Sequence, residues 1–219
     1  NCFRPAERAQ ARAANNLSAD DLVLAFGATG GFINPRKGGD QLLQALQILS
    51  HLLEAPTLVR LHLVIFGQES PAPGFSCPIR CTFVGDLTAL ELASLFAGAD
   101  LALVPSLQEP LGQVAIEALA CGCPVVAAAS GGLLDNVFPG LTGWLARPGD
   151  PESLAHALAA ALSLDPADRI QLGLEGVRHV GATCAPAAVA ARLHQAYGLA
   201  QDLFEDNQRR KLLPHGVAG

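Results

Sequence analysis

The sequence predicts an α/β fold in which a parallel sheet is covered by helices on both faces. Short runs that are apolar throughout alternate along the chain with longer segments of helical periodicity. The apolar runs lack the polar–apolar alternation of a half-exposed strand, which is typical of strands buried on both faces. Three of these runs end at a glycine or directly before one, at Gly27, Gly67 and Gly85. Strand–helix alternation of this kind predicts a parallel sheet whose ligands bind at the carboxyl ends of the strands.

The individual elements follow from the same patterns. The expected strands lie at 21–27, 61–66, 81–84, 101–104, 124–128 and 141–146. Thr88 and Glu91 have the spacing of a capping box, which places the start of one helix at Thr88. The other helices are expected at 39–53 and 111–120, after Pro151 and Pro166, and from Pro186 to about Phe204, with a short turn after Gly131 and Gly132. Residues 206–219 read as a loose tail.

Composition narrows the range of functions. At 219 residues the chain has room for one large domain with extensions, and 50% of it is apolar, which supplies a buried core. The net charge of −6 and the scattered basic residues predict no nucleic-acid surface, so any phosphate site must be local. The chain contains no methionine, and we interpret it as a piece of something longer. No apolar run approaches the roughly 18 residues of a membrane span, and no signal peptide opens the chain.

The cysteines are better explained as reduced thiols than as ligands or disulfides. Cys77 and Cys81 have three residues between them, and Cys121 and Cys123 flank a glycine. A zinc site and disulfides are the alternatives. Small buried thiols fit the helix–strand junction at residue 122, and reduced cysteines are the default in the cytosol. The six histidines are dispersed without ligand spacing.

Two glutamates eight positions apart form the first candidate site. Pro110 and Gly112 follow Glu109, and proline favours the first position of a helix, so Glu109 is expected at the helix edge and Glu117 about two turns in. The free N–H groups of that first turn are an anion site. Apolar residues surround Glu117 in the sequence, so its carboxylate needs a polar partner. A glycosidase pair and a metal site are weaker alternatives, and we assign no metal ligand.

A basic pair forms the second candidate site. Arg36 and Lys37 precede a helix start, where positive charge opposes the helix dipole and predicts a bound anion. Solvated surface charges are the alternative. The loop at 83–87 follows a strand, and Val84 and Leu87 are candidates for contact with a base. An ordinary strand-to-helix turn is the alternative.

The glycines at 27–31 resemble a dinucleotide-binding loop, which would make this an NAD(P)-dependent dehydrogenase of the short-chain type. That function requires a helix at the glycines, but Asn34-Pro35 is a turn signal. It also requires an acidic residue at the end of the next strand, about 20 residues on, and the next expected strand ends only at Phe66, so Glu69 comes too late. Gly30 and Gly31 are instead expected to let the backbone approach a sugar or phosphate.

Together these segments resemble the nucleotide-binding half of the retaining glycosyltransferases of family 4, or group 1, which have the GT-B fold. The resemblance runs from about residue 20 to 165. It rests on the following matches: Lys37-Gly38, Phe83-Val84-Gly85, Ala99-Asp100, Val104-Pro105-Ser106, Glu109 with Glu117, the run 117–126, Ser130-Gly131-Gly132 and Thr142-Gly143.

The resemblance implies a Rossmann-like donor domain at 21–184, preceded by a remnant of the interdomain linker at 1–20 and followed by a C-terminal helix at 185–205. It implies that Glu117 binds the ribose hydroxyls and Glu109 the donor hexose. It also implies that Lys37 binds phosphate, and that the backbone at Leu111, Gly112 and Gln113 faces the diphosphate and sugar. The expected reaction is retaining, metal-independent hexosyl transfer from a UDP- or GDP-sugar to a glycan or lipid-linked acceptor, without a cofactor.

The chain departs from the family pattern at two places. The family carries an arginine within the glycine loop, where this chain has Gly30 and Gly31, and Arg36 is the neighbouring substitute. The family's Glu-Gly-Phe-Gly is replaced by residues 109–112, Glu-Pro-Leu-Gly. The N-terminal acceptor domain is absent, so we expect donor binding without turnover by this chain alone. The alternative is a non-catalytic relative that binds nucleotide sugars. The family implies a cytoplasmic protein, with peripheral membrane contact of the full-length form as the alternative.

Overall fold

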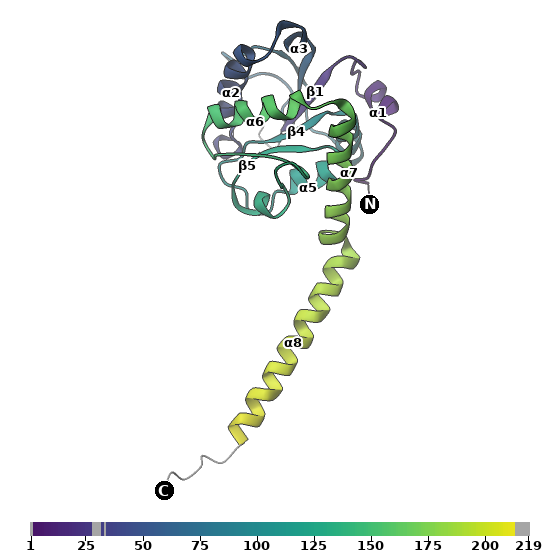
Figure 1. The fold of residues 1–219 in the computed structure, drawn as a ribbon, viewed down its shortest axis with the longest axis vertical. Coiled ribbons are helices and arrows are strands. Elements are labelled where there is room, and N and C mark those ends of the chain that lie inside the picture. Colours follow the sequence, from purple (N-terminus) through teal and green to yellow (C-terminus); the bar gives the residue numbers. More distant parts are fainter. Residues whose placement is uncertain (1, 28–31, 33, 213–219) are drawn as a thin grey trace. The chain divides into compact units, whose positions relative to one another are not determined.

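The computed structural model describes residues 2–27, 32 and 34–212, with side chains to residue 208. Its centre is a six-stranded sheet in which all neighbours are parallel, in the order β3-β2-β1-β4-β5-β6 (Figure 1). This confirms the predicted α/β class. The strands are β1 (Leu22–Gly27), β2 (Leu61–Phe66), β3 (Arg80–Phe83), β4 (Leu101–Val104), β5 (Val125–Ala128) and β6 (Gly143–Ala146).

The described helices connect these strands and follow the last one. They are α1 (Arg8–Ala14), α2 (Gly39–Leu52), α3 (Ala55–Arg60), α4 (Ala89–Gly98), α5 (Gln113–Ala120), α6 (Pro151–Ser163), α7 (Pro166–Thr183) and α8 (Pro186–Leu212). Two 3₁₀ turns, η2 (Pro35–Lys37) and η3 (Gly131–Asp135), lie in loops that follow β1 and β5. The capping box of Thr88 and Glu91 is present at the start of α4.

The strand order determines where a ligand can bind. The chain runs outward from β1 through β2 to β3, and then returns to place β4 on the other side of β1. In an open parallel sheet, such a reversal leaves a crevice at the carboxyl ends of the two central strands. The loop after β1 leads to Lys37, and the loop after β4 leads to Glu109. The topology therefore brings two predicted site residues, 72 positions apart in sequence, to one crevice.

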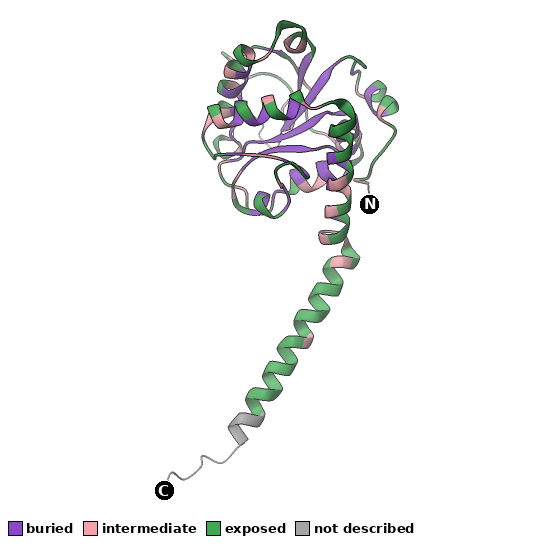
Figure 2. Ribbon diagram, in the orientation of Figure 1, coloured by how far each residue is buried: buried purple, intermediate pink, exposed green. Residues whose placement is uncertain are grey.

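The four inner strands of the sheet, β2, β1, β4 and β5, are buried on both faces, as their apolar sequences predict (Figure 2). The edge strands β3 and β6 are partly exposed. Helices α2 and α6 pack together over one face, and α4 and α5 contact strands on the other. Leu24 pairs with Leu63 of β2 and with Leu101 of β4, and all three side chains are fully buried. This rigid centre holds the strand ends, from which the functional loops emerge.

The start of α5 differs from the prediction. The helix begins at Gln113, and its N-cap is Gly112 in the left-handed conformation with φ 77°. Pro110 therefore does not occupy the first helical position, and Leu111 precedes the helix. Proline is common both at helix starts and in turns. Here the glycine, rather than the proline, supplies the change of backbone direction.

Two short helices differ from the sequence-based expectation. Residues 1–20, predicted as a linker remnant, contain α1, and α3 lies between α2 and β2. Both helices have seven residues or fewer, too short for periodicity to identify them. Two arginines of α1 bind Asp100, so the helix is held by tertiary contacts.

Helix α8 belongs to a second compact unit, Gly181–Gly219. It continues to Leu212, so the predicted end near Phe204 and the loose tail from residue 206 are wrong as far as residue 212. The stretch from 205 to 212 is polar, which favoured the interpretation as a tail. It contains helix-forming Glu, Gln, Arg, Lys and Leu and no glycine or proline. The described side chains of α8 are mostly exposed (Figure 2).

Within the described residues, no helix has the length and hydropathy required to cross a membrane. The six cysteines are free thiols in the structure, and Cys121 and Cys123 are buried between α5 and β5.

Candidate functional site

A cleft of about 490 Å³ lies at the carboxyl edge of the sheet. Its walls come from the end of β2, from η2, from the loop between β3 and α4, and from the loop and first turns of α5. Both charged and apolar side chains face it. The lining residues are Asn34, Arg36, Lys37, Phe66, Gly67, Asp86, Leu87, Leu92, Glu109, Gln113, Val114 and Glu117.

An ion pair between Lys37 and Glu109 spans one wall of this cleft. The Lys37 ammonium Nζ lies 2.7 Å from the Glu109 carboxylate Oε2. The two side chains are 25% and 13% exposed, so the pair is partly shielded but remains open to the cleft. A partly exposed pair of this kind contributes about 1 kcal/mol or less to stability. Its charges can therefore exchange partners at low cost when a charged ligand enters.

The backbone around Lys37 is held against the loop after β4. Leu107 N–H donates a hydrogen bond to the Arg36 carbonyl over 2.8 Å. Gly38 has φ 72°, and a Cβ at this position would lie 2.0 Å from the Pro105 carbonyl oxygen. Only glycine permits this approach, both because of its φ and because any side chain would collide with backbone. The Lys-Gly order thus directs the lysine toward Glu109 while allowing the two loops to touch.

A third loop supports Glu109 from the other side. Gly132 N–H donates to the Glu109 carbonyl over 2.9 Å, and the Ser130 hydroxyl donates to the Leu107 carbonyl over 3.1 Å. The segment after β5 therefore fixes the backbone that carries Glu109. The role of Ser130-Gly131-Gly132 in this structure is to position a neighbouring loop.

The Glu117 carboxylate lies on α5 one turn after Gln113. Gln113 Nε2 donates a hydrogen bond to Glu117 Oε1 over 2.9 Å. Burial raises the pKa of Glu117 above its usual value, and the hydrogen bond from Gln113 opposes that rise. This amide is the polar partner that the buried environment of Glu117 required. It holds the carboxylate at the cleft as a hydrogen-bond acceptor.

The structure brings most of the predicted side chains together. Six of the predicted residues line the cleft: Arg36, Lys37, Leu87, Glu109, Gln113 and Glu117.

Three predicted residues do not line the cleft. The Val84 side chain is exposed outside the cleft. Val84 lies between the last residue of β3 and Gly85, where a positive φ turns the chain. Leu111 is 59% exposed, and Gly112 acts as the N-cap of α5. Because the helix starts later than predicted, these two residues belong to the approach to the helix. Gly30 and Gly31 lie outside the described residues.

The basic pair lies at the cleft, and Lys37 already has an anionic neighbour there. The carboxylate of Glu109 pairs with Lys37, while the anion expected between Arg36 and Lys37 stays a prediction. Arg36 is exposed at the cleft, and among the described residues it forms no ion pair. The Asn34 side chain accepts a hydrogen bond from Arg36 N–H over 3.2 Å and so caps η2, in line with the predicted turn.

Besides Asn34, five of the lining residues were not among the predicted site residues. Phe66 and Gly67 end β2, and Asp86 belongs to the loop already noted at 83–87. Gly67 and Asp86 could have been identified from the sequence, because both lie in loops that directly follow a strand. Leu92 and Val114 lie on helices, where no sequence pattern distinguishes a cleft residue from a core residue.

The chain matches the family model described as glycosyl transferases group 1 over residues 24–163. The D-inositol 3-phosphate glycosyltransferase of Thermobispora bispora is 37% identical over 211 residues, which are 90% of this chain and 47% of that protein. The Mycobacterium bovis protein of the same description is 38% identical over 175 residues, or 74% of this chain and 34% of its own length. The chain thus spans about half or less of the curated relatives it matches.

Solved structures show the same fold. Sucrose-phosphate synthase from Thermosynechococcus elongatus aligns with 94% of this chain and 50% of its own, with 33% identity and a TM-score of 0.70. The Anabaena protein HepE, solved with UDP and glucose, has 20% identity and a TM-score of 0.68 over 92% of this chain and 54% of its own. The C-terminal domain of a group 1 glycosyl transferase from Francisella tularensis aligns with 84% of this chain and 97% of its own, with 21% identity and a TM-score of 0.67. The chain therefore belongs to the group 1 glycosyltransferases and has the Rossmann-like fold of the C-terminal domain of their GT-B architecture.

Proposed function

We propose that this chain binds a nucleoside-diphosphate sugar in the cleft at the carboxyl edge of the sheet. It would support transfer of the hexose to an acceptor, with retention of the anomeric configuration. The observation that carries the proposal is the placement of Lys37, Glu109 and Glu117 around one cleft of about 490 Å³. A cation between two hydroxyl-accepting carboxylates matches a diphosphate flanked by two sugars.

Each charged group then has a role set by its chemistry. Lys37 and the first turn of α5 bind the diphosphate, because an ammonium and free helix N–H groups both favour phosphate oxygens. Glu117, oriented by Gln113, accepts hydrogen bonds from the ribose hydroxyls. Glu109 accepts hydrogen bonds from the hexose. Leu87 and Phe66 supply apolar surface for the base.

Charge development explains how this arrangement would assist the reaction. When the glycosidic bond to the diphosphate breaks, negative charge grows on the departing phosphate. Lys37 lies ready to stabilise that charge, since its ammonium is held at the cleft wall by Glu109 before the donor arrives. Arg36 adds a second cation at the cleft mouth. Neutralisation by these groups is the basis for proposing that transfer requires no metal.

Three relatives support the substrate assignment. HepE was solved with UDP and with UDP-glucose, which favours a UDP-sugar here, and GDP-sugars are the second candidate. Two relatives are described as D-inositol 3-phosphate glycosyltransferases, and an inositol phosphate is polar and rich in hydroxyls. The acceptor site would lie in the half of the relatives that this chain does not span. We propose a glycan or lipid-linked acceptor. For the full-length protein we propose a cytoplasmic location, with peripheral membrane contact as the alternative. The chain by itself would bind donor without turnover.

Calorimetry in the presence of EDTA tests the proposal. We expect UDP or GDP to bind, and Lys37→Ala to weaken that binding about tenfold or more through loss of a charged hydrogen bond to phosphate. Arg178→Ala is the matched control, because it removes one exposed positive charge from α7 without touching the cleft. The absence of nucleotide binding, or equal loss in both variants, would contradict the proposal.

A second candidate function is nucleotide-sugar binding without transfer. The observation that favours it is the glycine pair at 30–31, where the family carries an arginine. A donor panel assayed with the full-length protein separates the two functions, because only the first releases nucleoside diphosphate. The dehydrogenase alternative predicts that NADPH, and not UDP, raises the melting temperature.

A further inference from the structure

A cluster of arginines lies at the amino edge of the sheet, at the end opposite the donor cleft. Asp100 directly precedes β4, and its side chain is 10% exposed. Its Oδ1 accepts from Arg8 Nη2 over 2.8 Å, and its Oδ2 accepts from Arg12 Nη2 over 2.8 Å. The Val23 N–H of β1 also donates to Oδ2 over 2.8 Å. Both carboxylate oxygens are therefore occupied by α1 and by the neighbouring strand.

Arg169 of α7 is the third guanidinium at this carboxylate, and it is left without a close counter-ion. Its Nε lies 3.9 Å from Asp100 Oδ1, beyond hydrogen-bond distance, and its side chain is only 8% exposed. Its Nη1 donates to the carbonyls of Leu162 and Leu164 at the end of α6. Within the described residues, Nε and Nη2 donate no hydrogen bond. One end of the guanidinium thus caps α6, and the other end has free donors.

These free donors open onto a small cavity. A space of about 70 Å³ lies beside the cluster. In the described part of the chain no fully buried side-chain nitrogen or oxygen lacks a partner, so Nε and Nη2 of Arg169 each keep some accessible surface, and Arg169 lines this space. Pro166, Arg169 and Ile170 lie at the start of α7, whose N–H end carries partial positive charge. The lining residues are Arg8, Ala99, Asp100, Gly122, Pro124, Pro166, Arg169 and Ile170.

The charges of the cluster do not balance. Arg8, Arg12 and Arg169 face the single carboxylate of Asp100, an excess of two positive charges. The nearby pair of Asp21 with Arg80 leaves that excess unchanged. Asp165 and Arg60 also act on Arg169, and their opposite charges cancel in the count. Burial lowers the pKa of both Arg12 and Arg169, which reflects the cost of holding guanidinium groups away from water. Since the whole chain carries −6, the positive excess is local and is not a property of the surface as a whole.

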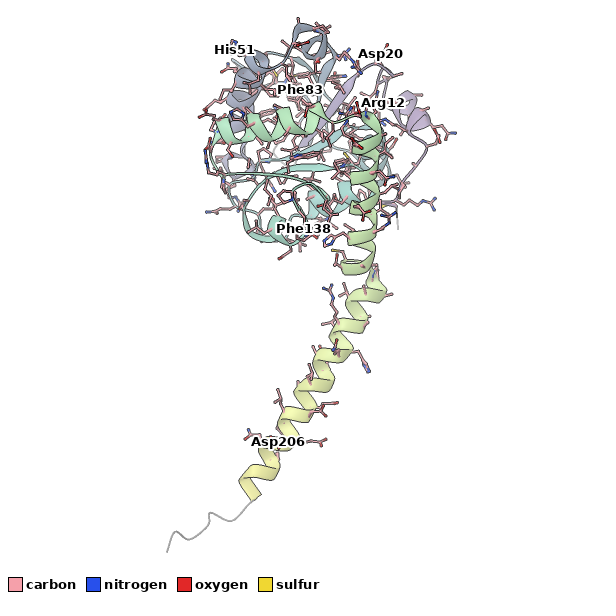
Figure 3. The ribbon with its side chains drawn as sticks, in the orientation of Figure 1. Arg12, Asp20, His51, Phe83, Phe138 and Asp206 are labelled. Atoms are coloured by element: carbon pink, nitrogen blue, oxygen red, sulfur yellow. The ribbon has the colours of Figure 1, made fainter. Side chains whose placement is uncertain are left out.

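We propose that the cavity at Arg169 binds one tetrahedral oxyanion of the phosphate class, as inorganic phosphate or as the phosphoryl group of a monoester. Arg169 would donate from Nε and Nη2 to two of its oxygens, the bidentate geometry that a guanidinium offers to phosphate. Arg8 and the first turn of α7 face the same space. Arg12, bound to Asp100, lies where α1 and the start of α7 come together (Figure 3). The bound anion would join these two helices to the start of β4.

Titration of the arginine Nε–H signals by NMR tests this site in the unchanged chain. Inorganic phosphate should shift the Nε–H signals of Arg169 and Arg8 in a saturable manner, at constant ionic strength and with UDP filling the donor cleft. Phosphate should also raise the melting temperature, since a ligand that binds only the folded state stabilises it. Phenyl phosphate is the second arm: equal shifts identify the phosphoryl group as the ligand, and shifts with inorganic phosphate alone identify the free ion.

Variants separate this site from the donor cleft. Arg169→Gln should weaken phosphate binding at the amino edge about tenfold, and Arg8→Gln less, because Arg8 is 40% exposed. Lys37→Ala should leave the Arg169 shift unchanged even if the donor cleft no longer binds nucleotide. The proposal is overturned if phosphate shifts no arginine signal in the wild-type chain, if it shifts all of them uniformly, or if the Lys37→Ala variant loses the Arg169 response.

Discussion

The two edges of the sheet use charged side chains in opposite ways. At the carboxyl edge, Lys37 and Glu109 form one open pair in a cleft of about 490 Å³. At the amino edge, Asp100 is held by Arg8 and Arg12 beside a cavity of about 70 Å³. The first pair can exchange partners with a ligand. The second arrangement fastens α1 to the sheet, and two of its three arginine side chains are 8% exposed.

The difference lies in the number of partners that each carboxylate holds. Glu109 accepts from one ammonium, whereas Asp100 accepts from two guanidinium groups and from the Val23 N–H. An open pair contributes little to stability, so it can be rearranged during a reaction. A buried charge that loses its partner is strongly destabilising. The following predictions test this contrast, from the largest expected effect to the smallest.

Asp100→Asn should give the largest effect, and it should act on stability. The substitution leaves three guanidinium groups without a carboxylate, and we expect the free energy of unfolding to fall by about 3–5 kcal/mol. Urea unfolding measures the change. Glu175→Gln is the control, because it breaks an exposed pair with Arg178 on α7 and should change stability little. Similar losses in the two variants would show that the Asp100 cluster stabilises the fold no more than an exposed pair does.

Glu117→Gln should act mainly on binding. Loss of the ionised acceptor should reduce UDP affinity about tenfold and leave 2′-deoxy-UDP much less affected, because hydrogen bonds to charged groups are the strong ones. Calorimetry with both nucleotides gives the ratio.

The same variant has an opposite effect on stability. The pKa of Glu117 is raised in the folded protein, so the folded state binds this proton more tightly than the unfolded state does. The resulting stabilisation is fully present at low pH, and it is lost as the pH rises through the folded pKa. The glutamine side chain imitates the protonated form, and the variant should therefore be more stable than the wild type at neutral pH. This gain should shrink as the pH falls below the folded pKa. A variant that is less stable at neutral pH would show that the carboxylate has structural partners.

Glu109→Gln should have a smaller effect on binding. It should raise the affinity for UDP and lower the extra affinity that a UDP-sugar gains from its hexose. Without its carboxylate partner, Lys37 is free to meet phosphate, so UDP should bind about two- to fivefold more tightly. The extra affinity that a UDP-sugar gains from its hexose should fall, because a hexose contact is lost. Competition binding of UDP against its sugar conjugates measures both. Weaker binding of UDP itself would mean that Glu109 does not restrain Lys37.

Gln113→Leu should produce the smallest change. Its hydrogen bond opposes the rise in the pKa of Glu117, so removing it should raise that pKa further. UDP affinity, which depends on the ionised carboxylate, should then begin to fall at a higher pH than in the wild type. Measurements of Kd across the acidic range test this shift. An unchanged pH profile would show that Gln113 is only a neighbour of Glu117 and does not orient it.

Much of this fold could be predicted because its strands are buried on both faces. The runs at 61–66 and 101–104 match β2 and β4 residue for residue. Short, almost wholly apolar runs are typical of strands in a covered parallel sheet, and His62 is the one polar residue in these two runs. The short helix α1 could not be predicted, because Arg8 lies 92 positions before Asp100, the partner that holds the helix. Polar residues at 206–212 gave no periodic signal, yet they form the end of α8.

The site was predictable to the extent that its residues follow strands. Lys37 and Glu109 could be placed on one edge from topology alone, but their direct contact depends on the approach of Gly38 to Pro105, which only coordinates reveal. Leu111 and Gly112 were assigned to the site from the family resemblance, and the helix was expected to begin at residue 111. A glycine that acts as N-cap and a proline that starts a helix leave similar sequence signals, and the two could not be separated.

The contact between Lys37 and Glu109 also bears on how the nucleoside diphosphate would be released after transfer. On the proposed assignment, the diphosphate and the carboxylate compete for the same ammonium. Once the hexose has gone, Glu109 has lost its other ligand and can recapture Lys37, which loosens the hold on the phosphate. The enzyme would thus carry its own displacing group, and turnover would not have to wait for the nucleotide to dissociate from an unopposed cation.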